Sequence, residues 1–294
     1  MRKIEVKNDK NGIPRIFLNN KPYFQKGVLD QGYWPDGLYT APSDEALIYD
    51  IQTMKNLGFN MIRKHVKVET ARWYYHCDRL GMIVWQDMVN GGTYNAPFMT
   101  WLPALFPKFK LHTSDRIHPL FGRKNVHGRE EFIRECKETV TALKAFPCIS
   151  TWVIFNEGWG QFDSKKLTAL FRELDDTRLI DSASGWFDRR QGDFKSEHNY
   201  FAKQFVTPSD RAFVISEYGG YTCQVKGHTC SGKTYGYKIC SSQEEFQAAY
   251  HKLMSEEIDP LKEQGLCGAV YTQLSDIEDE INGLITYDRE VCKL

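Results

Sequence analysis

Short apolar runs alternate with amphipathic stretches along most of the chain. Behind the polar start at Ser43, apolar residues such as Leu47, Ile51 and Met54 recur at helical spacing until Gly58, which predicts a helix over residues 44–57. The runs MIVW, WVIF and FVIS are almost wholly apolar. Such runs are typical of parallel strands that are covered on both faces.

The same pattern predicts eight strands, most of them followed by a helix. We expect strands over residues 23–29, 60–65, 82–88, 149–155, 179–184, 196–200, 212–216 and 269–274, and further helices over 69–80, 129–145, 165–176 and 243–264. An alternating chain with eight strands is best satisfied by an α/β fold of the closed (β/α)8 TIM barrel type. A doubly wound open sheet is the alternative, but no glycine-rich phosphate-binding motif follows any strand.

Three segments stand outside this alternation. Residues 14–24 predict a β-hairpin that turns at Asn19-Asn20 and covers the bottom of the barrel, so that residues 1–22 form a leader. Long loops follow strand three, over residues 89–128, and strand seven, over residues 221–242. The first loop is rich in aromatic residues, which favours an ordered lid over a packed surface flap. No linker divides the chain, and we expect one domain over residues 1–294.

The composition argues against several classes of protein. The 38 basic and 38 acidic side chains cancel, whereas a nucleic-acid binder needs a basic excess. No apolar run is long enough to span a membrane, and the start of the chain lacks the apolar segment of a signal peptide, so a cytoplasmic protein is expected.

The eight cysteines show no C-x-x-C and no paired zinc spacing. We expect reduced thiols and no metal. A disulfide or a metal site in the loop that holds Cys223, Cys230 and Cys240 is the alternative.

Candidate chemistry lies where the strands end, because the loops that form the mouth of a barrel follow the carboxyl ends of its strands. The polar residues at these ends are Asp30, Arg63, His65, Asp87, Asn156, Glu157, His198, Glu217 and Asp276. Glu157 and Glu217 directly follow apolar strands, and each has a glycine within the next two residues. A buried carboxylate is costly unless it is paired or opens into a cavity. Two of them, on strands four and seven, would face each other across the mouth.

Paired carboxylates suit the hydrolysis of glycosides. One must be protonated to expel the leaving oxygen, and the other must be ionised to attack the anomeric carbon. Unequal surroundings separate the two pKa values. A narrow mouth makes a separation near 5 Å plausible, which predicts retention of configuration. The alternative for either glutamate is a purely structural role, in which it caps the next helix or pairs with an arginine.

Six segments give the chain a resemblance to the catalytic barrel of glycoside hydrolase family 2, which holds β-galactosidases, β-glucuronidases and β-mannosidases. They span residues 20–37, 58–69, 73–88, 152–160, 213–220 and 270–290. The resemblance implies a retaining exo-β-glycosidase that needs no cofactor, with Glu157 as acid/base and Glu217 as nucleophile. It implies that Asn156 binds the sugar 2-hydroxyl and that Arg63 supports the nucleophile.

Weaker candidates for the sugar pocket are His65, His198 and Tyr218, together with the strand-end residues Asp87 and Gln273 and the aromatic residues Trp34 and Trp159, which could stack on sugar faces. Gln273 stands where many relatives place a tryptophan, and we find no Asn-x-Lys pair of the kind that glucuronidases use. We also expect the family's accessory β-sandwich domains to be absent, and the loop over 89–128 to line the aglycone side. A β-galactoside-like substrate is our first expectation. The oligomeric state is left open.

Three other functions compete with this one. β-Glucuronidase or β-mannosidase activity would use the same chemistry. A barrel that binds carbohydrate with little turnover would bind saccharide without cleaving an activated aryl glycoside. A metal-dependent lyase would use Asp87, Glu157 and Asp181 at consecutive strand ends, but it leaves Glu217 unexplained.

Overall fold

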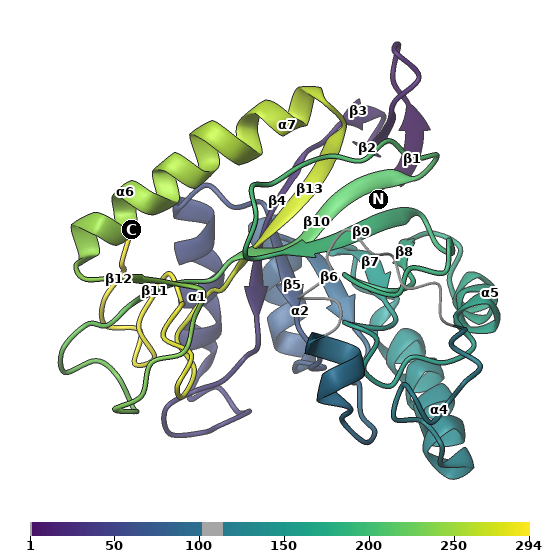
Figure 1. Ribbon diagram of the computed structural model, residues 1–294, viewed down its shortest axis with the longest axis horizontal. Coiled ribbons are helices and arrows are strands. Elements are labelled where there is room, and N and C mark those ends of the chain that lie inside the picture. The colour runs from purple at the N-terminus through teal and green to yellow at the C-terminus, as the bar shows by residue number, and fades with distance from the viewer. Residues whose placement is uncertain (1, 102–113) are drawn as a thin grey trace.

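Eight parallel strands form the centre of the computed structural model, which describes residues 2–101 and 114–294 (Figure 1). Their order is β8-β7-β6-β5-β4-β13-β10-β9, and every neighbouring pair is parallel. The strands are β4 (Gln25–Asp30), β5 (Met61–Lys64), β6 (Ile83–Asp87), β7 (Ile149–Val153), β8 (Leu179–Asp181), β9 (Phe194–Asn199), β10 (Ala212–Gly219) and β13 (Leu266–Thr272).

The two end strands of this order, β8 and β9, are joined by backbone and side-chain hydrogen bonds. The backbone N–H of Asp193 donates to the Ile180 carbonyl at 2.8 Å, and the Ser196 hydroxyl donates to the Asp181 carboxylate. The sheet is therefore a nearly closed barrel, which confirms the predicted TIM barrel.

Helices cover the outside of the barrel. They are α1 (Asp44–Asn56), α2 (Ala71–Leu80), α4 (Val126–Leu143), α5 (Ser164–Leu174), α6 (Gln243–Leu253) and α7 (Asp259–Glu263), with π-helical segments η1 (Pro97–Trp101) and η2 (Met254–Ile258). The Ser43 hydroxyl caps α1 by accepting from the Ala46 N–H, and Gly81 ends α2 with a left-handed φ of 69°. Residues 182–193 and 200–211, all of them described, contain no helix. The segments that follow β8 and β9 are therefore free to shape the mouth.

An N-terminal sheet closes the end of the barrel where the strands begin. It consists of β1 (Ile4–Asn8), β2 (Pro14–Leu18) and β3 (Lys21–Pro22), and Asn19 and Asn20 turn with positive φ as predicted. Ile4 and Ile16 pack with interior residues of the barrel such as Trp85. The predicted hairpin thus covers the bottom, and strand β1 is an addition that the prediction lacked (Figure 1).

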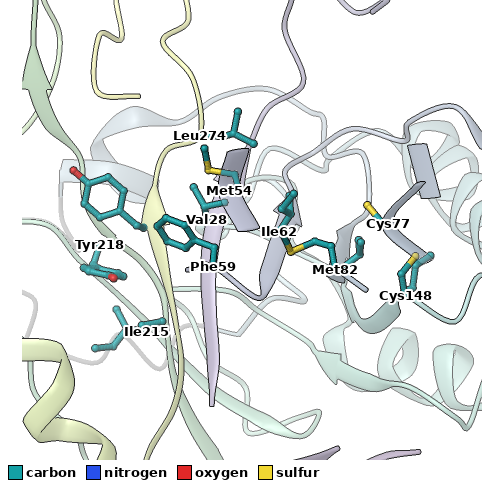
Figure 2. Packing of buried hydrophobic residues seen from close by; sticks show 14 of the residues in the cluster. Val28, Met54, Phe59, Ile62, Cys77, Met82, Cys148, Ile215, Tyr218 and Leu274 are labelled. Atoms are coloured by element: carbon teal, nitrogen blue, oxygen red, sulfur yellow. The ribbon is translucent and has the colours of Figure 1, made fainter. Parts of the chain in front are cut away.

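A second, larger cluster lies between the strands and the helices. It includes Val28 and Ile62 from the outer side of the strands, together with Met54 of α1 and Tyr218 (Figure 2). The loop after β10 adds a small parallel pair, β11 (Tyr221–Cys223) and β12 (Lys238–Cys240). All eight cysteines lie in the described part, where they are free thiols.

Candidate active site

Two glutamates meet at the carboxyl end of the barrel. Glu157 comes from the turn after β7, and Glu217 lies near the end of β10. One oxygen of each carboxylate lies within 4.8 Å of the other and of a nitrogen of His198. The two glutamates are 60 positions apart, with α5, β8 and β9 between them, so the barrel brings together side chains that are far apart in sequence.

A tight turn of the backbone directs Glu157 toward the site. Glu157 has a positive φ of 53°, and its N–H donates to the Ser184 carbonyl at 3.0 Å. Gly158 follows with φ 71°, and a Cβ there would meet the Phe187 ring at 2.4 Å. A non-glycine residue with positive φ is uncommon and clusters at functional sites. This tight turn explains why the sequence has glycine directly after Glu157.

Glu217 faces the site because β10 is irregular. Val214 points into the barrel, so strict alternation would turn Glu217 outward. The register of β10 against β9 and β13 shifts between Ile215 and the residues that follow. Such an irregularity re-aims a side chain. Glu217 therefore faces Arg63 while Tyr218 packs in the outer cluster.

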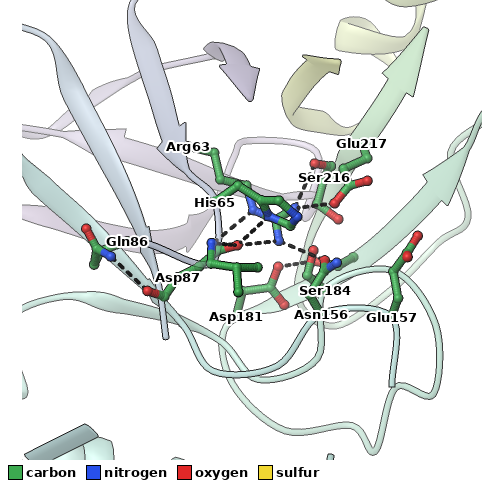
Figure 3. A network of polar contacts seen from close by, with 12 residues as sticks. Arg63, His65, Gln86, Asp87, Asn156, Glu157, Asp181, Ser184, Ser216 and Glu217 are labelled. Atoms are coloured by element: carbon green, nitrogen blue, oxygen red, sulfur yellow. Dashed lines mark hydrogen bonds and ion pairs between the residues drawn. The ribbon is translucent and has the colours of Figure 1, made fainter. Parts of the chain in front are cut away.

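Arg63 is the hub of the site (Figure 3). Its side chain is fully buried and donates to both oxygens of Asp87 at 3.0 Å, to Glu217 Oε1 at 3.2 Å and to Asn156 Oδ1 at 2.8 Å. Burial alone would lower the pKa of Arg63, but Asp87 and Glu217 raise it. Burial would likewise raise the pKa of Asp87, but Arg63 and His65 lower it. One fixed cation thus links strands β5, β6 and β10 with the Asn156 turn.

His198, on β9, lies between the two glutamates. Its Nδ1 is 2.9 Å from Glu157 Oε1, while its Nε2 is 3.0 Å from Ser184 Oγ and 3.5 Å from Glu217 Oε1. Burial lowers the pKa of His198 to about 4, although Glu217 opposes this change. The imidazole is therefore neutral near pH 7, with a single N–H to donate.

The surroundings of the two glutamates are unequal. Glu217 accepts from Arg63 and, through Oε2, from the Tyr200 hydroxyl at 2.6 Å. Glu157 contacts His198, and 31% of its side-chain surface is exposed. Burial raises the pKa of Glu157 to about 6, against the opposing charges of His65 and Arg63. Near neutral pH, Glu157 is therefore the carboxyl group that is able to carry a proton, while Glu217 faces a guanidinium.

Tyr200 is a site residue that the sequence analysis missed. Its hydroxyl lies 2.6 Å from Glu217 Oε2 and 2.9 Å from Thr272 Oγ1, and its ring stacks on Tyr237 with centroids 3.9 Å apart. Burial raises the pKa of Tyr200 well above its ordinary value, so the hydroxyl keeps its proton. Its one sequence signal was its place at the end of the sixth predicted strand.

Three remaining candidates lie on the segments that follow β5, β13 and β7. His65 Nδ1 is 2.7 Å from Asp87 Oδ2, and both belong to the Arg63 network. Gln273 follows β13, beside Thr272. Trp159 is 37% exposed on the turn after Glu157, and its ring meets Tyr94 edge-on at 5.7 Å.

Two predictions about the sugar pocket are wrong. Tyr218 is fully buried, and its hydroxyl lies against Met254 Sδ at 3.3 Å in the outer cluster. Trp34 is 5% exposed, and the Arg289 guanidinium covers its ring at 4.2 Å. Neither ring has a face open to a ligand, because in each case packing outside the barrel uses the surface that we expected to serve a sugar.

Residues 102–113 of the long loop after β6 lie outside the described part. In the part that is described, Met99, Phe121 and Phe187 form a small buried cluster with Phe98 packed against it. The predicted role of this loop as a lid stays a prediction.

The carboxylates of Asp87 and Asp181, which a metal-dependent lyase would use, already have protein partners. Both oxygens of Asp87 are engaged by Arg63, and Asp181 accepts from Ser196. Burial raises the pKa of Asp181 to about 7. Glu157, His198 and Glu217 do place donor atoms close enough to ligate a cation, but Arg63 and Tyr200 already contact Glu217. The site is organised around a guanidinium.

The geometry thus defines a TIM barrel with one glutamate at the end of its fourth strand and another at the end of its seventh. Residues 5–292 match the family described as glycosyl hydrolases family 2, TIM barrel domain, and the chain belongs to this family. Within the described residues, no helix has the length and apolar character needed to cross a bilayer.

Individual relatives agree with this assignment. A β-galactosidase from Priestia megaterium is 24% identical over 248 residues, which cover 78% of this chain and 21% of the relative. A β-galacturonidase structure from Eisenbergiella tayi with bound galacturonate superposes with a TM-score of 0.70 at 17% identity, covering 99% of this chain and 52% of that one. A β-glucuronidase structure from an uncultured Clostridium species gives 0.66 at 15% identity, covering 99% and 51%. This chain therefore spans about a fifth of the curated relative and about half of the two solved structures.

Proposed function

We propose that this chain hydrolyses a terminal β-linked sugar with retention of configuration, and that its substrate is β-galactoside-like. The observation that carries the proposal is the pair of carboxylates, which have one oxygen each within 4.8 Å of the other and lie in unequal surroundings. Retaining glycosidases place their two carboxyl groups about 5–5.5 Å apart, whereas inverting enzymes leave room for a water molecule. The short separation therefore supports double displacement.

In the first step, Glu217 attacks the anomeric carbon. The bond from that carbon to the leaving oxygen breaks, and Glu157 gives its proton to the leaving oxygen. In the second step, Glu157 takes a proton from water, and the resulting hydroxide displaces Glu217 from the covalent glycosyl-enzyme. The pKa of about 6 suits Glu157 to both steps near neutral pH, since a group that donates and later accepts works best near the ambient pH.

We assign to Asn156 the role of holding the sugar. Its Oδ1 accepts from Arg63 at 2.8 Å, which fixes the amide and leaves Nδ2 to donate to a substrate hydroxyl. This orientation supports the role that the resemblance implies, a contact with the sugar 2-hydroxyl. His198 keeps Glu157 in place through its Nδ1 contact.

The proposal is tested with 4-nitrophenyl β-glycosides of galactose, glucose, mannose, arabinose and glucuronic acid, assayed at several pH values. We expect release of nitrophenol, with the galactoside as the best substrate. NMR of the first product should show the β-anomer. Absence of hydrolysis across the panel, or an α-anomer formed first, would contradict the proposal.

Two variants test the assigned roles. Glu217→Ala should abolish turnover, while Glu157→Ala should keep activity on substrates with good leaving groups, because only poor leaving groups need protonation. Glu278→Gln is a matched control, since Glu278 is an exposed glutamate in the segment after β13. Near-normal hydrolysis by the Glu217 variant would refute the nucleophile assignment.

A further inference from the structure

A third carboxylate lies beside the proposed site, in the segment after β13. Glu280 Oε2 accepts from Gln273 Nε2 at 2.9 Å and from Gln31 Nε2 at 3.2 Å. Gln31 follows β4 and Gln273 follows β13, and these two strands are neighbours. We call Gln31, Gln273 and Glu280 the glutamine–glutamate cluster.

This cluster lies next to the residues that hold Glu217. Thr272 directly precedes Gln273, and its hydroxyl is 2.9 Å from the Tyr200 hydroxyl, which donates to Glu217. The charges of His65 and Glu217 both act on Glu280, and burial raises the pKa of Glu280. The cluster therefore borders the place where a sugar would meet Glu217.

The cluster offers hydrogen-bond acceptors. Each glutamine amide has two N–H groups. Those of Gln31 go to Gln273 Oε1 and Glu280 Oε2, and those of Gln273 go to Glu280 Oε2 and Asn282 Oδ1. In contrast, Glu280 Oε1 has no donor among the described residues, and Glu280 is only partly buried. The two amides fix the carboxylate and leave one of its oxygens for a ligand.

The buried cations of β5 and the turn after it are already held by protein groups. In the described part of the chain, no lysine or arginine forms an ion pair with Glu280. Arg63 is held by Asp87, Glu217 and Asn156. Lys64 pairs with Asp30, and Lys67 pairs with Glu69. A second carboxylate brought by a ligand would therefore meet Glu280 without a compensating cation from these residues.

We infer that Glu280 is a specificity-determining residue, which accepts a hydrogen bond from a hydroxyl of a neutral terminal sugar and repels the carboxylate of a uronic acid. The inference rests on the proposed function, because it places the sugar at Glu157 and Glu217. A fixed, ionised acceptor makes stronger hydrogen bonds to hydroxyls than a neutral one does. Two carboxylates in one site oppose each other's ionisation.

The test compares the wild-type chain with Glu280→Gln, which keeps the shape and removes the charge. The matched control is Glu278→Gln, two residues away and exposed. Values of kcat/KM are measured for 4-nitrophenyl β-galactoside, β-galacturonide and β-glucuronide. Binding of galactose, galacturonate and glucuronate is measured in parallel by calorimetry, which needs no turnover, and thermal melting checks that each variant folds.

We expect the wild type to prefer the neutral sugar. In Glu280→Gln, the kcat/KM for the uronides divided by the kcat/KM for the galactoside should rise by about tenfold or more, because the charge that repels a uronic acid is gone. The control should keep the wild-type ratio. A wild type that prefers a uronide, or an unchanged ratio in Glu280→Gln, overturns the inference, and so does a chain that binds none of the three sugars.

The binding arm separates this inference from the proposed function. If no glycoside is hydrolysed but galactose binds and galacturonate binds only after the Glu280 charge is removed, the proposed function fails and the role of Glu280 stands. If hydrolysis proceeds but the ratio of kcat/KM values does not change in Glu280→Gln, the role of Glu280 is refuted and the proposed function stands.

Discussion

The protonation of Glu157 should set how activity falls as the pH rises. Burial raises its pKa to about 6, so the acid form is present below that pH and is lost above it. With a pKa near 6, roughly nine in ten Glu157 side chains are protonated at pH 5, and roughly one in ten at pH 7. On a substrate with a poor leaving group, kcat/KM should therefore fall about tenfold for each pH unit above 6.

The perturbation is Glu157→Gln, which keeps a similar shape but has no proton to give. On an alkyl β-galactoside the variant should lose most of its activity and show no decline centred near pH 6. On a dinitrophenyl β-galactoside, whose leaving group needs no proton, wild type and variant should have similar kcat/KM for the first step. The assay is a series of initial rates between pH 4.5 and 8.5.

One outcome would refute this reasoning. If Glu157→Gln kept the wild-type decline near pH 6 on the alkyl substrate, another group would carry the proton. His198 is not that group in this structure, because burial lowers its pKa to about 4.

Two further predictions concern Tyr200 and the end of the chain. Tyr200→Phe removes one hydrogen bond to a charged acceptor, about 1.5–3 kcal/mol, and should lower kcat/KM by about 10- to 100-fold. Tyr237→Phe, which keeps the ring stacked on Tyr200 and removes only the hydroxyl of that ring, should not lower kcat/KM, and equal losses in both variants would contradict the role of the Tyr200 hydroxyl. Lys293→Met leaves the buried Asp276 without its cation and should reduce the free energy of unfolding by about 3–5 kcal/mol in urea titrations at pH 7.5. The loss should shrink at pH 5, because burial already raises the pKa of Asp276 to about 6 and protonation removes the unpaired charge; a loss that grows toward acid pH would refute this.

The placement of the two glutamates at strand ends could be predicted because the strands that precede them have regular apolar patterns. The apolar runs before Glu157 and Glu217 identify strands, and a β/α barrel places the ends of all its strands at one mouth. The same regularity placed Arg63, Asp87 and His198 at the site. The order of strands and helices therefore sufficed for the fold and for bringing these residues to one mouth, whereas the inward direction of Glu217 comes from the irregularity in β10.

The errors came where the backbone departs from that regularity. A shift of one residue turns a strand side chain to the other face, and the irregularity in β10 points Glu217 inward and Tyr218 outward. Tyr200 stands at the very end of the sixth predicted strand, and Glu280 lies in a segment without helical or strand periodicity, so no pattern in the sequence indicated the direction of either side chain. Their roles depend on contacts with residues far away in the sequence, which only the folded chain reveals.

The most direct test of the central claim is to trap the covalent intermediate. The chain is incubated with a 2-deoxy-2-fluoro-β-galactosyl fluoride, digested, and examined by mass spectrometry. We predict one added sugar, attached to the peptide that contains Glu217 and absent from the Glu217→Ala variant. A sugar attached to any other residue, or full turnover with no labelled protein, would contradict the assignment of Glu217 as the nucleophile.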